Sequence, residues 1–80
     1  MSGQPIVAFI LIDVDIGKEY EVLNKIIENY GPSISEARVT YGEHDLVVKI
    51  EVSNMRALDS IVTGIRQING VRRTITLISS

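Results

Sequence analysis

The chain has 80 residues, no cysteine and a formal net charge of −2, with 8 lysines and arginines against 10 aspartates and glutamates. This length allows one small domain, and the lack of cysteine excludes disulfides, so a partner subunit is the leading source of the extra stability that small domains need. A net negative charge does not indicate a surface that binds the phosphates of a nucleic acid. No apolar stretch approaches the roughly 20 residues that cross a bilayer. We therefore expect one soluble, cytoplasmic domain over residues 1–80, with neither nucleic acid nor a membrane as a direct partner.

The first predicted element is a strand over residues 6–12. It follows a short polar arm, residues 1–5, that lacks the features of a signal peptide. The strand sequence, IVAFILI, is a continuous apolar run that is short for a helix and rich in branched side chains, as in a strand covered on both faces. Residues 17–30 then place apolar side chains at helical spacing with charged ones opposite, which predicts an amphipathic helix. Gly31 and Pro32 mark its end, and Gly31 is expected in the left-handed conformation.

A hairpin is predicted next. Residues 33–40 show the mixed alternation of an edge strand, residues 42–45 form the turn, and residues 46–52 alternate apolar and charged side chains. These features predict two antiparallel strands joined by a tight connection.

A second helix and a last strand complete the chain. Asn54 is a good N-cap for the helix, which closes at Asn69-Gly70, and the strand follows over residues 71–78. Gly64 costs about 1 kcal/mol relative to alanine inside a helix, which indicates a close approach of this helix to the sheet.

The element order is therefore βαββαβ. Right-handed crossovers place strands 6–12 and 46–52 in the middle of a four-stranded antiparallel sheet with both helices on one face, which is the ferredoxin-like α+β sandwich. Strand 6–12 has no polar face, so either Val7, Phe9 and Leu11 or the alternate residues lie on the side that the helices leave open. Such a patch in so small a protein favours a dimer that packs sheet to sheet.

The chain offers few groups for catalysis. Its single histidine, His44, stands between Glu43 and Asp45, and neighbours in a tight turn rarely point at one another. Asp13 and Asp15 have a spacing that occurs in cation sites, but further ligands are missing nearby, and the favoured interpretation is that they keep a strand end soluble. We expect a protein that is not an enzyme, with no cofactor and no metal site.

Two segments suggest a ligand site. Residues 41–45 combine a flexible glycine, exposed amides and acidic side chains, and Thr74 and Thr76 face the same side of an edge strand. A carboxylate, free amides and hydroxyls could bind the ammonium and carboxylate groups of an α-amino acid. Ordinary turn chemistry and the β-propensity of threonine explain the same residue types equally well.

With these residues in view, the chain resembles the effector-binding RAM domain of the Lrp/AsnC (feast/famine) transcription regulators. The resemblance is carried by residues 6–10 (IVAFI), 34–37 (ISEA), 40–49 (TYGEHDLVVK) and 68–76 (INGVRRTIT). Those regulators carry a helix-turn-helix domain before this one, and here only 5 residues precede the first predicted strand. The chain therefore resembles a stand-alone RAM domain.

The resemblance implies face-to-face dimers, octamers or similar rings of dimers, and an amino-acid effector bound between dimers. It also implies a role in modulating full-length Lrp/AsnC regulators or an enzyme through assembly. Asp45 would be the partner of the effector ammonium. Carried over by position, the ligand-binding residues are Tyr41, Gly42, Glu43, His44, Asp45, Thr74 and Thr76.

Two other families share the βαββαβ order. An ACT-type regulatory domain of a metabolic enzyme also binds amino acids, but its usual proline-glycine pair before the first helix is Ile16-Gly17 here, and the closing G-V-x-x-T-x-T favours the RAM resemblance. An acylphosphatase-like enzyme would need an arginine in the first loop, where residues 13–17 supply only acids.

Overall fold

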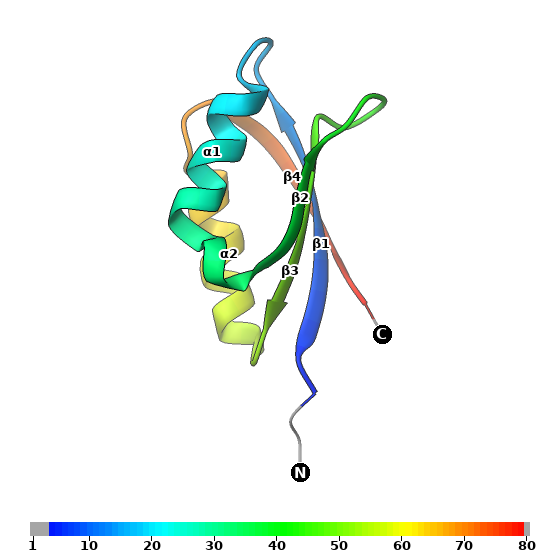
Figure 1. The fold of residues 1–80 in the computed structure, drawn as a ribbon, viewed down its shortest axis with the longest axis vertical. Coiled ribbons are helices and arrows are strands. Elements are labelled where there is room, and N and C mark those ends of the chain that lie inside the picture. Colours follow the sequence, from blue (N-terminus) through cyan, green and yellow to red (C-terminus); the bar gives the residue numbers. More distant parts are fainter. Residues whose placement is uncertain (1–3, 80) are drawn as a thin grey trace.

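The computed structural model describes residues 4–79 and contains a four-stranded antiparallel sheet in the order β2-β3-β1-β4. Helices α1 and α2 lie side by side against one face of this sheet, and the other face is open (Figure 1). The elements are β1 Ile6–Val14, α1 Glu19–Tyr30, the 3₁₀ turn η1 Gly31–Ser33, β2 Ile34–Val39, β3 Leu46–Val52, α2 Met55–Arg66 and β4 Val71–Ile78. The predicted α+β sandwich with β1 and β3 in the centre is confirmed. Within residues 4–79 no helix is long and apolar enough to cross a membrane.

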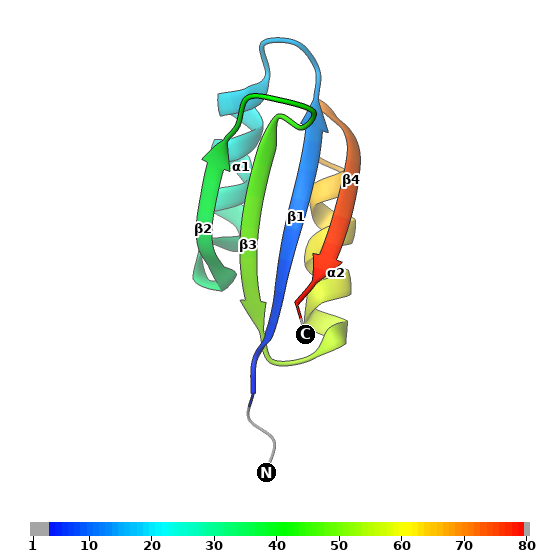
Figure 2. The same cartoon turned by 90° about the vertical axis from the view of Figure 1, so that its right-hand side faces the viewer.

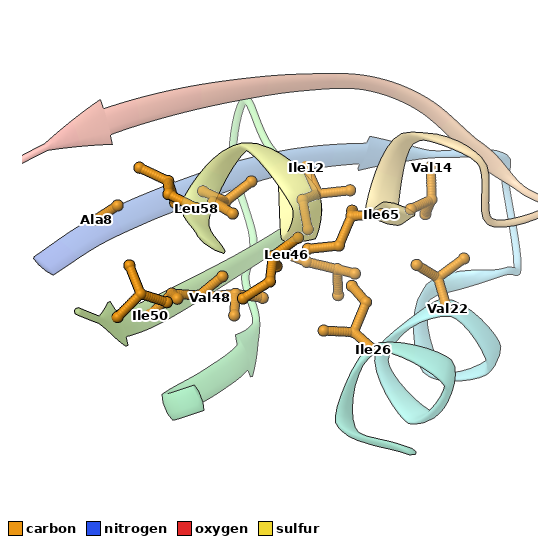
Figure 3. Packing of buried hydrophobic residues seen from close by; sticks show 13 residues of the cluster. Ala8, Ile12, Val14, Val22, Ile26, Leu46, Val48, Ile50, Leu58 and Ile65 are labelled. Carbon is orange, nitrogen blue, oxygen red and sulfur yellow. The ribbon is translucent and has the colours of Figure 1, made fainter. Parts of the chain in front are cut away.

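The alternation along β1 decides which side chains face the helices. The core contains Ala8, Ile10, Ile12 and Val14 of β1. The neighbouring strand β3 contributes a second row of buried residues, Leu46, Val48, Ile50 and Val52. Figure 3 shows these rows packed against apolar residues of α1 and α2. The residues of β1 that lie on the open face are therefore Val7, Phe9, Leu11 and, at its end, Asp13.

The ends of the helices are set by local chemistry. Asn54 caps α2 as predicted, because its Oδ1 accepts a hydrogen bond from the Ala57 amide at 2.8 Å. The expectation for Gly31 is wrong, since its φ of −46° and ψ of −45° are right-handed. Glycine can precede proline in this conformation because it has no Cβ to meet the ring, and Pro32 fits the first turn of η1, where its missing N–H is not needed.

Gly64 has a different neighbour from the one expected. A Cβ added at Gly64 would overlap the hydroxyl of Tyr30, at the end of α1. The close approach is therefore between the two helices and not between α2 and the sheet, and it lets the Tyr30 ring lie against the backbone of α2.

Candidate functional site

Residues 40–45, which connect β2 to β3, are fastened to the end of the sheet. The Thr40 amide donates to the Asp45 carbonyl at 2.9 Å, and the Asp45 amide donates to the Ile12 carbonyl at 3.0 Å. The Thr40 hydroxyl donates to the His44 carbonyl at 2.7 Å. Figure 2 shows the segment passing over the start of β3 toward the end of β1. Gly42 permits this path, because its φ of +140° is rarely adopted by residues with a side chain.

Asp45 joins this segment to β1. The pairing of β1 with β3 ends at Ile12 and Leu46, so the last residues of β1 run past the start of β3. There the Asp45 carboxylate accepts a hydrogen bond from the Val14 amide at 2.8 Å. Asp45 therefore satisfies a backbone donor at the end of a strand, a structural role that the sequence did not indicate.

Asp13 lies at the centre of a small polar cluster. Its Oδ1 is 2.9 Å from His44 Nδ1, and its Oδ2 accepts a hydrogen bond from Arg73 Nε at 3.2 Å. The hydrogen bond to His44 is the main reason that the pKa of Asp13 lies below its ordinary value of 3.8, and the Arg73 charge adds to this while burial opposes it. His44 thus points to neither sequence neighbour, and its partner is 31 residues away.

Asp15, directly after β1, also contacts an arginine. Asp15 Oδ1 lies 3.9 Å from Arg72 Nε, a looser contact than that of Asp13 with Arg73. Among residues 4–79, histidines, cysteines and acids form no group of three that could hold a metal ion.

Two hollows flank the 40–45 segment. The first, of about 450 Å³, is called the arginine hollow and is lined by Asp13, Val14, Glu43, Asp45, Arg72 and Arg73. The second, of about 420 Å³, is called the tyrosine hollow and is lined by Glu19, Tyr20, Val39, Thr40, Tyr41, Gly42 and Asp45. Asp45 borders both, so the segment predicted to bind a ligand separates two candidate sites.

The two predicted threonines lie elsewhere in a single copy of the chain. Thr74 pairs with Ile12 and Thr76 with Ile10, and both of these isoleucines point into the core. The threonines therefore share a face, as predicted, but it is the face that the helices cover, and they line neither hollow.

The arginines are the residues that sequence reasoning missed. Asp13 pairs with Arg73 and Val14 with Val71, so Arg72 has no opposing residue, which is the pattern of a β-bulge. The sequence did carry a signal, because the end of β1 is rich in acids and the antiparallel strand beside it begins Val-Arg-Arg. A bulge, however, breaks the alternation from which one decides which face of the sheet a side chain lies on.

Known proteins are similar to this chain over nearly its whole length. A family model described as the Lrp/AsnC ligand binding domain matches residues 7–80. The HTH-type transcriptional regulator FL11 of Pyrococcus furiosus is 41% identical over 76 residues, which are 95% of this chain and 49% of that regulator. The chain thus spans about half the length of the curated relatives it matches.

Solved structures share the fold. Hypothetical protein PHS023 from Pyrococcus horikoshii is 39% identical with a TM-score of 0.84, and the match covers 94% of this chain and 89% of that one. Transcriptional regulator NMB0573 from Neisseria meningitidis, solved as a complex with L-Met, has a TM-score of 0.79 over 94% of this chain and 49% of that one. At 17% identity this second likeness is one of fold alone.

Proposed function

The chain belongs to the Lrp/AsnC ligand-binding domain family, and on that premise we propose that it is a non-catalytic module that binds an amino acid and assembles with copies of itself. The family match favours the RAM resemblance over the ACT-type alternative. The observation that carries the ligand-binding part is the arginine hollow, where acidic and basic side chains stand around one space of about 450 Å³. An α-amino acid offers the matching pair of opposite charges.

Self-association is supported by the open face of the sheet. The register places Phe9 beside Leu77, and Leu11 between Val47 and Ile75. Phe9 is 36% exposed and Leu77 51% exposed in a single copy. A contiguous apolar patch of this kind in a small domain is a surface for a partner, and a second copy across a two-fold axis covers it with itself. Octamers or similar rings of such dimers belong to the same proposal.

The biological setting follows from the relatives. FL11 is a transcriptional regulator, and the NMB0573 structure, alike in fold, holds L-Met. The proposed role is to modulate transcription regulators, including full-length members of the family, or an enzyme, through ligand-dependent assembly in the cytoplasm. This domain would contact neither nucleic acid nor a membrane directly.

The test measures thermal stability and oligomer mass together, with each of the twenty standard amino acids. A ligand present at 100 times its dissociation constant stabilises the folded state by about 2.7 kcal/mol, so the melting temperature rises for any amino acid that binds. An unchanged melting temperature and mass across the whole panel would refute the ligand-binding part. A single subunit at micromolar concentration would refute the assembly part.

A further inference from the structure

The turn between α2 and β4 places an asparagine directly before a glycine. The Val71 amide donates to the Ile68 carbonyl at 3.1 Å, which closes a turn with Asn69 and Gly70 at its centre. Gly70 has a φ of +103°, whereas the φ of Asn69 is not positive, as in a type II turn. Asn69 is exposed to solvent, and Gly70 is buried. The side chain of Asn69 therefore lies at the surface of a tightly bent main chain.

Two groups of this turn that could react with each other are not engaged elsewhere. The side-chain amide of Asn69 has no hydrogen bond with any residue between 4 and 79, and the Gly70 N–H has none either. Glycine carries no Cβ that would keep its nitrogen away from the preceding side chain. Asparagine is one of the thermolabile residues of proteins. The Gly70 nitrogen can therefore reach the Cγ atom of Asn69 when the turn opens.

The other asparagines of the chain lack this combination. Asn24 and Asn29 lie within α1, where the backbone amide after each is held in the helix and belongs to a residue with a side chain. Asn54 caps α2, and its Oδ1 accepts a hydrogen bond from the Ala57 amide at 2.8 Å. Asn69 is therefore the asparagine whose surroundings best permit attack by the following nitrogen.

We infer that Asn69 is a site of spontaneous deamidation and that its β-aspartyl product loosens the start of β4. The Gly70 nitrogen loses its proton and bonds to Cγ of Asn69, the Cγ–Nδ2 bond breaks, and Nδ2 takes up a proton and leaves as ammonia. Water then adds to one of the two carbonyl groups of the five-membered imide and opens the ring. The product is either aspartate or a β-aspartyl residue, and no oxidation or reduction is involved.

The β-aspartyl product changes the main chain at a place where it is fixed. Its peptide bond runs through the side chain, which inserts an extra atom into the turn. The Asp15 amide donates to the Gly70 carbonyl at 2.8 Å, and a Cβ added at Gly70 would lie 3.2 Å from Val22. Directly after the turn, Val71 pairs with Val14. The extra atom must therefore disturb the hydrogen bond from Asp15, the packing on Val22 or the first pair of β4 with β1.

The experiment incubates the full chain in mildly alkaline buffer below its melting temperature and follows each asparagine by mass spectrometry. Trypsin cleaves after lysine and arginine, so each of the four asparagines falls in a separate fragment, and Asn69 lies in residues 67–72. That fragment should gain the mass difference between NH₂ and OH while the other three fragments stay unchanged. Labelling by an isoaspartate-specific methyltransferase identifies the β-aspartyl form.

Two variants separate the change of the main chain from the change of charge. Asn69→Gln keeps a side-chain amide, but attack by Gly70 would have to close a six-membered ring, so it is the matched control for incubation. Asn69→Asp carries the new charge on an unchanged main chain. The incubated wild-type chain should melt at a lower temperature than fresh wild type, incubated Asn69→Gln and fresh Asn69→Asp.

Each part of the inference has its own contradicting result. If the fragment of residues 67–72 keeps its amide as long as the other three fragments do, Asn69 is not a preferred deamidation site. If that fragment is deamidated but the incubated wild-type chain melts at the same temperature as incubated Asn69→Gln, the product does not loosen β4.

Discussion

Asp45 is the single residue whose structural and ligand-binding roles most need to be separated. Replacing it with alanine leaves the Val14 amide without its acceptor, which should lower the free energy of unfolding by about 1–3 kcal/mol. Asp45→Asn keeps an oxygen that can accept this hydrogen bond and should lower the free energy of unfolding by less than about 1 kcal/mol. Urea unfolding of the two variants without any ligand measures the difference, and equal losses would mean that the hydrogen bond to Val14 contributes little.

Asp13 predicts a pH dependence of stability. Its pKa in the folded chain lies below the ordinary value of 3.8, mainly because of the hydrogen bond with His44. A carboxylate with a lowered folded pKa stabilises the fold above its unfolded pKa, and this contribution disappears as the pH falls through the lowered value. The free energy of unfolding should therefore drop as the pH falls below about 4, and Asp13→Asn should flatten that part of the profile.

Asp15→Asn is the matched control for this experiment. It makes the same change in net charge two residues along the chain, at an ion pair of 3.9 Å instead of the closer contacts of Asp13. Chemical denaturation at each pH between about 2 and 6 supplies the profiles, a range that brackets the ordinary aspartate pKa. If the two asparagine variants lose the same part of the pH dependence, the effect comes from overall charge and not from the Asp13 cluster.

Packing between the two helices gives a prediction at the level of elements. Alanine is favoured over glycine in a helix by about 1 kcal/mol, but a Cβ at Gly64 would meet the Tyr30 ring. Gly64→Ala should therefore destabilise the wild-type chain by about 1–2 kcal/mol, as overpacking does. In a Tyr30→Ala background the same change should stabilise the chain by about 1 kcal/mol. A double-mutant cycle of unfolding free energies measures this reversal, and additive effects would show that the two residues do not interact.

The elements were predictable where local pattern and turn chemistry agree. Strands β3 and β4 have the bounds expected from alternation, because a turn precedes β3, the N-cap of α2 follows it, and the turn at Gly70 precedes β4. Strand β1 extends two residues beyond its predicted end, because Asp13 and Val14 are paired with β4 and no local signal marks that pairing. The errors at Gly31 and Gly64 have the same origin, since the first depends on how the chain continues through Pro32 and the second on a side chain of another helix.

The candidate site was predictable only in part for a related reason. The 40–45 segment has recognisable turn chemistry, and all of its residues except His44, which contacts Asp13, line one of the two hollows. The arginine hollow depends on a bulge, which shifts the pairing of β4 by one residue and cannot be read from alternation. The hydrogen bond from Val14 to Asp45 likewise depends on the register of β1 against β3, which sets how far β1 runs past its neighbour.

At the scale of the whole molecule, the open face of the sheet has two unlike halves. Over β2 and β3 it is largely charged, with Arg38 bound to Glu36 at 2.9 Å and Ser35 bound to Glu51 at 2.8 Å. Over β1 and β4 it is apolar as far as Leu11 and Ile75, beyond which Asp13 pairs with Arg73. Lys49 lies at the border, with its Nζ 6.0 Å from the centre of the Phe9 ring. A dimer that packs sheet to sheet should therefore centre on β1 and β4, with the charged half at its rim.

Substitution of Leu77, compared with the same substitution of a similarly exposed residue on α1, tests where the dimer interface lies. Leu77→Glu puts a charge at the predicted centre of the interface, where it would be buried without a partner, so the dimer should dissociate to single subunits. Ile27, on α1, is 47% exposed against 51% for Leu77, so Ile27→Glu changes a similar amount of apolar surface away from the sheet and should leave the dimer intact. Sedimentation at micromolar concentration distinguishes the two, and dissociation caused by Ile27→Glu but not by Leu77→Glu would move the interface from the open face of the sheet to the helices.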